Sequence, residues 1–159
     1  MKNQFLKFTL TFLLLFVLTL SCEDNPVSNN ENHFSNSIEQ EVYQLINLHR
    51  TGIGLDPLEW SDVIAAECRL HSRDMAGEQT INHDGFNERI ERIREKISLN
   101  WAGENVAMNW SAQAAVDAWL NSSGHKSNIE SNSNLTGVGL AFDADSAMYF
   151  TQIFVRSSN

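Results

Sequence analysis

The chain has 159 residues and carries 20 acidic against 11 basic side chains, a formal net charge of −9. This length suits one ordinary domain and is short for two. The acidic balance argues against nucleic acid or an anionic lipid surface as a direct partner, because both are bound through basic patches. The composition therefore indicates one acidic domain with no nucleic-acid partner.

Residues 1–21 have the pattern of a secretory signal peptide. Lys2 and Lys7 form its positive start, and the apolar run 8–20 is broken only by threonine. A membrane-spanning helix needs about 20 apolar residues, whereas a run of this length is typical of a signal-peptide core. We expect this segment to be removed and the mature protein to lie outside the cytoplasm.

Ser21-Cys22 closes the run and looks like a bacterial lipoprotein cleavage site, with Cys22 as the lipidated N-terminus. The alternative is an ordinary secretory signal with an incidental cysteine, because Thr19 stands where lipoproteins usually carry an aliphatic residue. Residues 22–37 are rich in Asn, Ser and acid, so they are expected to form a flexible tether. The protein is then either a membrane-anchored lipoprotein of the cell envelope or a secreted protein.

The domain is expected over residues 38–159, and its first part has helical periodicity. Apolar residues that recur at three and four positions predict helices near residues 38–51, 62–77, 86–97 and 112–121. Asn36-Ser37 is the expected cap of the first helix, and Ser61 or Asp62 that of the second. The third helix, near residues 86–97, is expected to carry its Glu and Arg side chains on its outer face.

Several polar residues on these helices have a structural interpretation. Asn47 and Arg50 lie three apart, which fits either a solvated face or a buried polar brace that binds loop carbonyls. His71 is interpreted as a core histidine with a hydrogen-bond partner, and Cys68 as a small buried hydrophobe rather than a nucleophile. Cys68 is also the only cysteine after Cys22, so no disulfide within the mature chain is expected.

The periodicity changes toward the end of the chain. Residues 135–142 and 148–155 are β-rich runs joined by the hairpin-like Asp143–Ser146, and Leu58 and Trp60 alternate as a short extended anchor. Helices first and strands last predict an α+β domain in which helices cover the faces of a small sheet.

Three side chains stand out as candidates for a site. His83 lies in a polar turn, Glu104 follows Gly103 in Gly-Glu-Asn, and His125 follows the helix-breaking run 122–124. A carboxylate beside a glycine turn and an imidazole at a helix end are both held by short, well-determined backbone, as a functional site requires.

With their surrounding segments, these residues resemble the CAP superfamily (cysteine-rich secretory proteins, antigen 5 and pathogenesis-related 1). The likeness is strongest to its disulfide-free, single-domain secreted bacterial branch. It covers residues 38–155 and rests on Asn47-x-x-Arg50, Leu58-x-Trp60, Met75, His83, Gly103-Glu104-Asn105, residues 119–129, Gly137-Val138-Gly139 and residues 149–152. The resemblance implies an α-β-α sandwich with a small antiparallel sheet flanked by helices.

The resemblance also implies a cleft in which His83, Glu104 and His125 meet, and some members of the superfamily bind a divalent metal there. The second acid of the superfamily would fall near Asn121 or Ser122, where this chain has no acid. Asp117 lies one helical turn earlier and is not a simple substitute.

Two chemical interpretations of the cleft stay open. His83 and His125 with Glu104 could hold zinc with an open position for water. They could equally form a histidine pair oriented by Glu104 without metal. Ser122 and Ser123 beside His125 are interpreted as helix C-terminal residues rather than nucleophiles.

The leading functional hypothesis is a lipid-anchored binding protein whose cleft receives a lipid or other apolar small molecule, a peptide or a cell-envelope component. The alternative is a metal-assisted hydrolase or peptidase with Glu104 as the general base. A third hypothesis is a passive structural module. The sequence leaves open whether the protein is an enzyme.

Overall fold

The computed structural model describes the backbone from Pro26 to Ser158 and the side-chain surroundings from Asn36 onward. The signal peptide and the proposed lipidation site at Cys22 lie outside the described residues. Within the described part of the chain, no helix combines the length and the hydropathy of a membrane span.

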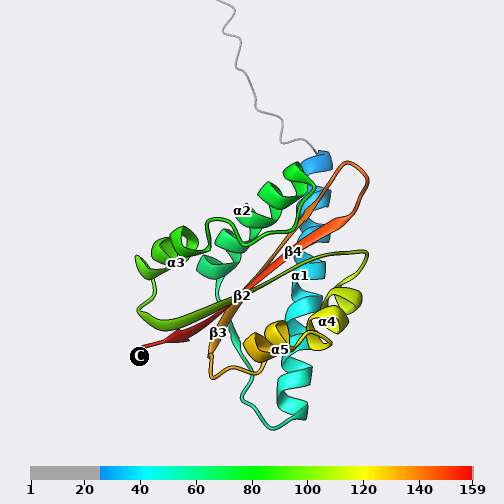
Figure 1. The fold of residues 1–159 in the computed structure, drawn as a ribbon. Helices are drawn as coiled ribbons and strands as arrows, with labels where there is room; N and C mark the ends of the chain where they lie inside the picture. The colour runs from blue at the N-terminus through cyan, green and yellow to red at the C-terminus, as the bar shows by residue number, and fades with distance from the viewer. Residues whose placement is uncertain (1–25, 159) are drawn as a thin grey trace, which may run out of the picture.

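A four-stranded sheet forms the middle layer (Figure 1). Its strands are β1 (Glu59–Trp60), β2 (Leu99–Asn109), β3 (Leu135–Phe142) and β4 (Met148–Ser157), in the order β1-β3-β4-β2. β3, β4 and β2 are antiparallel, as expected, whereas β1 pairs with β3 in parallel. The sheet is therefore mixed. The segment between β1 and β3 contains α2, α3, β2, α4 and α5, which is long enough for the crossover that parallel strands require.

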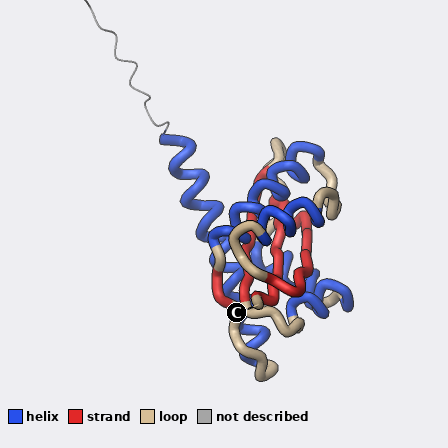
Figure 2. The backbone as a smooth tube through the Cα atoms, turned by 90° about the vertical axis from the view of Figure 1, so that its left-hand side faces the viewer, coloured by secondary structure: helices blue, strands red, loops and turns tan. Residues whose placement is uncertain are grey.

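Between Pro26 and Ser158, five helices cover the two faces of this sheet. α2 (Asp62–Glu78) and α3 (Phe86–Arg94) lie on one face, and α1 (Pro26–Gly52), α4 (Ala112–Leu120) and α5 (Ser123–Ile129) lie on the other (Figures 1 and 2). The expected α-β-α sandwich is confirmed.

The first helix begins earlier than expected. α1 runs without interruption from Pro26 through Asn36 and Ser37, so the capping position assigned to these two residues is wrong. Proline at the first helical position fits this start, because its missing N–H has no helical partner there and its φ is already helical. Figure 2 shows the N-terminal part of α1 extending past the rest of the domain.

The largest core lies between the sheet and the layer of α1 and α4. It includes Trp119, Phe150 and Phe154, all nearly inaccessible to solvent. The indole Nε1 of Trp119 donates to the carbonyl of Val106 at 3.0 Å, so its polar atom is satisfied. The spacing of three and four residues that Trp119 shares with Val116 and Ala115 in the sequence predicts a core position, and its burial confirms this prediction.

Two glycines let α2 lie directly on β3. A Cβ atom at Gly137 would lie 2.2 Å from the backbone nitrogen of Ala65, and one at Gly139 would lie 2.2 Å from that of Arg69. Cys68 Sγ and Ser72 Oγ donate to the carbonyls of these glycines at 3.3 and 3.0 Å. The Gly-Val-Gly run is thus required for helix-to-sheet contact. Burial raises the pKa of the Cys68 thiol, which agrees with its interpretation as an inert core residue.

Arg50 and Asn47 form the buried brace rather than a solvated face. Arg50 is 2% exposed and donates to the carbonyls of Asp56, Ile129, Ser131 and Ser133. Asn47 pairs with both backbone groups of Leu58, donating at 3.0 Å and accepting at 2.8 Å. These bonds join the end of α1 to β1 and to the segment between α5 and β3.

Candidate functional site

Glu104 lies in the middle of β2, an edge strand of the sheet, and not beside a turn as the sequence suggested. Gly103 is needed here for space. A Cβ at this position would lie 2.7 Å from Cη2 of Trp101 and 2.7 Å from Oδ1 of Asn128. The Glu104 side chain is 2% exposed and points toward α3.

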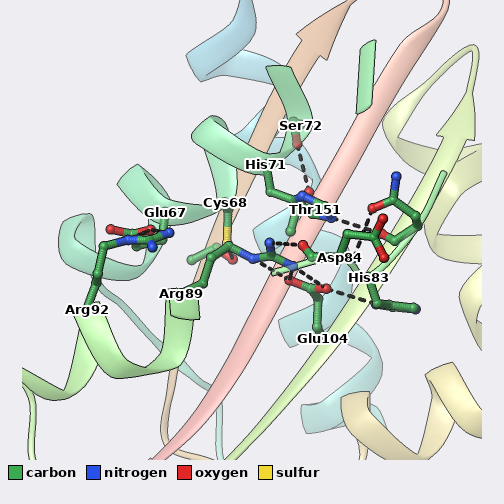
Figure 3. A network of polar contacts seen from close by, with 12 residues as sticks. Glu67, Cys68, His71, Ser72, His83, Asp84, Arg89, Arg92, Glu104 and Thr151 are labelled. Atoms are coloured by element: carbon green, nitrogen blue, oxygen red, sulfur yellow. Dashed lines mark hydrogen bonds and ion pairs between the residues drawn. The ribbon is translucent and has the colours of Figure 1, made fainter. Parts of the chain in front are cut away.

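Arg89 on α3 binds the Glu104 carboxylate in a forked geometry (Figure 3). Its Nε lies 3.0 Å from Oε2, and its Nη2 lies 2.8 and 2.7 Å from Oε1 and Oε2. Nη1 donates to the carbonyl of Asp84 at 2.6 Å. A fork of this kind is among the strongest charge-assisted contacts in proteins.

The expectation that all the arginines of this helix face outward is therefore wrong for Arg89, which is 4% exposed. The spacing of residues along this helix already indicated that Arg89 is buried. Arg89 lies three residues after Phe86 and four before Ile93, so it belongs to the apolar stripe and must be buried with a partner.

His83 is the third member of this cluster. Its Nδ1 lies 2.8 Å from Oε1 of Glu104, while its side chain is 53% exposed (Figure 3). An ionised carboxylate only accepts hydrogen bonds, so Nδ1 carries the proton and donates. In its neutral form the ring presents the lone pair of Nε2, and Glu104 sets both the tautomer and the ring orientation.

His125 reaches the same edge of the sheet from the opposite helical layer. It lies in the first turn of α5, for which Ser122 is the N-cap residue, so Ser122 and Ser123 begin a new helix and do not end α4. Burial and the neighbouring His83 lower the pKa of His125. The neutral imidazole is therefore the favoured form on both counts.

Side-chain amides tie α5 to β2. Asn105 Nδ2 donates to the carbonyl of His125 at 3.1 Å. Asn128 Nδ2 donates to the carbonyl of Glu104 at 3.1 Å and to Oδ1 of Asn105 at 2.9 Å. These bonds cover part of the free edge of β2 and fix His125 relative to Glu104. The structure thus brings His83, Glu104 and His125 to one edge, from three separate segments.

His71 does not belong to this site. It is 2% exposed, and its Nε2 lies 2.9 Å from the carbonyl of Asn82, so it is a satisfied core histidine, as expected. The bond does contribute indirectly, because it holds the start of the turn that carries His83.

The donor set does not fit the zinc site that the sequence suggested. Both oxygens of Glu104 are engaged by Arg89 and His83, so the carboxylate orients His83 instead of offering a ligand. Asp117 is exposed and accepts from Gln113 at 2.8 Å. Among the described residues, no group of three or more His, Cys, Asp or Glu side chains could hold a metal ion. A catalytic zinc takes three protein ligands, and only two imidazoles remain.

Comparison with known proteins identifies the family. The family profile described as the cysteine-rich secretory protein family, CAP, matches residues 43–154. YkwD of Bacillus subtilis is 31% identical over 121 residues, which are 74% of this chain and 46% of YkwD. The membrane protein YlbC of the same bacterium is 34% identical over 122 residues, which are 74% of this chain and 34% of YlbC. The chain therefore spans less than half the length of each of these relatives.

Solved structures share the fold. An extracellular protein of Bacillus anthracis that contains an SCP domain is 30% identical with a TM-score of 0.69, over 86% of this chain and 45% of that one. An outer surface protein of Borrelia burgdorferi is 23% identical with a TM-score of 0.70, over 78% of this chain and 96% of that one. The chain belongs to the CAP family, as its sequence motifs indicate, and has the fold of the bacterial SCP domains.

Proposed function

We propose that this protein is an extracytoplasmic binding module whose CAP cleft receives the polar end of a lipid, a peptide or a cell-envelope component. The observation that carries the proposal is the chain of contacts from Arg89 through Glu104 to His83. Arg89 neutralises the buried carboxylate, and the carboxylate fixes the ring of an exposed histidine. A fixed side chain loses little freedom when a ligand binds.

The two imidazoles determine what the cleft can recognise. In its neutral form, His83 offers Nε2 as an acceptor, and His125 supplies a second imidazole whose lowered pKa favours the neutral ring. A ligand group that donates a hydrogen bond, such as a hydroxyl or an amide N–H, suits Nε2 of His83. Apolar parts of the ligand would then extend from the cleft along the domain surface.

The engagement of Glu104 weighs against the alternative, a metal-assisted hydrolase or peptidase. A general base must accept a proton from water, but each oxygen of Glu104 already accepts hydrogen bonds from Arg89 or His83.

Ligand binding is tested by mass spectrometry of small molecules that co-purify with the full chain from bacterial membranes. A molecule retained by the wild type and by His33→Ala, but lost from His83→Ala and from His125→Ala, would support the cleft as the binding site. Retention by all variants would place the ligand elsewhere. If the protein hydrolyses a peptide library and Glu104→Gln abolishes this hydrolysis, the hydrolase is favoured. If neither ligand binding nor hydrolysis is detected, the structural module is favoured.

We also propose that the domain is held to the cell envelope by lipid at Cys22. The extracellular Bacillus anthracis relative and the membrane protein YlbC support a location outside the cytoplasm. Several acyl chains give stable attachment, whereas a single chain binds only marginally. Cys22→Ala should release the protein from the membrane fraction or leave the precursor uncleaved. Normal processing with unchanged membrane attachment would contradict the lipid anchor.

A further inference from the structure

A hollow lies on the α5 side of the sheet, between α5 and the ends of β2 and β4. It has a volume of about 790 Å³ and is bounded by the start of β2, by α5 and the segment after it, and by the end of β4. His83, Glu104 and His125 do not line it. Its volume is within the range of small-molecule sites, roughly 300–1,000 Å³.

Trp101 supplies the aromatic wall of this hollow. The indole lies against the backbone of Gly103, where a Cβ atom would come within 2.7 Å of Cη2 of the ring. The residue is nevertheless 38% exposed. Contact with Gly103 therefore holds the ring in place and leaves part of it open to a ligand. A rigid, half-exposed indole of this kind supplies contact area at a low entropic cost.

Cations and small polar side chains surround the indole. Ser127, Ser131 and Asn132 line the hollow together with Lys126 and Arg156. The carboxylate in its lining is that of Glu130, whose Oε1 lies 3.8 Å from Lys126 Nζ and 2.9 Å from Nε2 of His49. Two positive side chains against one carboxylate make this hollow a locally positive site on an acidic protein.

Arg156 is already oriented. Its Nη1 donates to the carbonyl of Asn132 at 2.9 Å and to Oδ1 of the same residue at 2.6 Å. The other edge of the guanidinium has no hydrogen-bond partner among the described residues. A guanidinium held in this way is preorganised for a carboxylate.

From this arrangement we propose that the Trp101 hollow binds a sugar that carries a carboxylate. The C–H face of a pyranose ring packs on the negative face of the indole. Its hydroxyl groups match the serine hydroxyls and the Asn132 amide, and its carboxylate pairs with Arg156 and Lys126. The cations Lys126 and Arg156 would stay unpaired against a purely apolar ligand, which distinguishes this site from one for a lipid tail.

A smaller hollow of about 260 Å³ adjoins the first and shares Glu130, Ser131, Asn132 and Arg156 with it. Together they form a groove that extends from Trp101 toward the loop after α1. The ligand is therefore expected to be longer than one sugar. The acid can belong to the sugar ring itself or to a lactyl substituent, and the experiment below separates these sources.

The test is calorimetric titration of the full chain with N-acetylmuramic acid, glucuronic acid and N-acetylglucosamine. We expect saturable binding of at least one acidic sugar, with about tenfold weaker binding of N-acetylglucosamine, a difference of about 1.4 kcal/mol. Binding of N-acetylmuramic acid alone would assign the acid to a lactyl group, and binding of glucuronic acid alone would assign it to the ring. Saturable binding of neither acid, or equal binding of all three sugars, would overturn the proposal.

Matched variants locate the site. Trp101→Ala should weaken binding at least tenfold, whereas Trp110→Ala removes a tryptophan that is 68% exposed elsewhere and should change it less than twofold. The double variant Lys126→Gln/Arg156→Gln should bind acidic and uncharged sugars equally, and it keeps the test valid if Trp101→Ala does not fold. Equal losses from the two tryptophan variants would overturn the assignment. His83→Ala should bind the sugars normally, so this proposal and the proposed cleft function can fail separately.

Discussion

Two glutamate–arginine pairs in this domain have a buried carboxylate and similar hydrogen bonds, but they differ in their consequences. Glu39 on α1 is bound by Nε and Nη2 of Arg69 on α2, and Glu104 on β2 is bound by the same atoms of Arg89 on α3. The Glu39 and Glu104 side chains are only 1% and 2% exposed. In each pair, one carboxylate oxygen also accepts a third donor.

The third donor separates the two pairs. For Glu39 it is the backbone N–H of Leu140 at 3.1 Å, on the edge of β3 beyond the two residues that pair with β1. For Glu104 it is His83, whose side chain is half exposed. The first pair therefore completes a sheet edge, and the second orients a surface histidine. Similar ion pairs can thus complete a sheet edge in one place and orient an exposed histidine in another.

The largest expected effect comes from breaking the second pair. Arg89→Met leaves the Glu104 carboxylate buried without its cation, which should lower the free energy of unfolding by about 3–5 kcal/mol. Urea denaturation measures the change. The matched control is Arg92→Met on the same helix, because Arg92 pairs with Glu67 and its side chain is 48% exposed. This exposed pair should contribute about 1 kcal/mol or less. Equal losses would show that Arg89 is not buried in solution.

Removing the first pair should have an intermediate effect. Glu39→Leu leaves the N–H of Leu140 and the Arg69 guanidinium without their acceptor, and a buried unsatisfied donor costs about 1–3 kcal/mol. Glu41→Leu, a change to an exposed glutamate on the same helix, is the control. A Glu39→Leu protein as stable as the control would contradict the role of Glu39 at the sheet edge.

The Glu39→Leu variant also allows a test of how stability depends on pH. Burial raises the pKa of Glu39 and outweighs the opposing effect of Arg69. Between its ordinary and its raised pKa, Glu39 binds more protons in the folded than in the unfolded state. Its contribution to stability is therefore complete below the ordinary pKa and declines as pH rises through the folded value. The wild type should gain stability relative to Glu39→Leu as pH falls from 7 through this range. A loss would contradict the raised pKa.

A smaller change is expected from His83→Ala. The side chain is half exposed and Glu104 keeps Arg89, so the free energy of unfolding should stay within about 0.5 kcal/mol of the wild type. His71→Ala removes a buried histidine with a backbone partner and should cost more. If the His83 variant were the less stable of the two, His83 would be mainly structural and the proposed binding role would lose its basis.

The smallest effect is a titration shift. The pKa of His125 should lie below its ordinary value because of burial and then of His83, and NMR of the imidazole protons with a chelator present measures it. His83→Ala should raise it. The unfolded chain binds more protons in this range, so the stability associated with neutral His125 is complete above its ordinary pKa and is lost as pH falls through the folded value. An unchanged His125 pKa in the variant would show that the two rings are not neighbours.

The sequence alone determined much of this protein. Periodicity located α2, α3, α4, the C-terminal part of α1 and the final hairpin, because one-sided burial imposes a spacing of about 3.6 residues on helices and 2 on strands. It did not locate α5 or β2. The sequence also identified Trp119 as a core residue and His71 and Cys68 as buried side chains, and its motifs indicated the CAP family and the residues His83, Glu104 and His125. Motifs that occur in the same order as in a family indicate the family and the site residues, because each motif has a fixed place in the fold.

Only the tertiary structure decided which partners those residues contact. Gly103-Glu104-Asn105 was interpreted as a turn, but the glycine makes room for Trp101 and Asn128 within a strand. The partner of Glu104 is Arg89, and nothing in the local sequence says which carboxylate a buried arginine meets across the fold. The Trp101 hollow likewise joins β2, α5 and β4. The spacing of apolar residues indicates which face of a helix or strand is buried. Which side chains contact one another depends on how the helices and strands pack together, and the whole chain determines that packing.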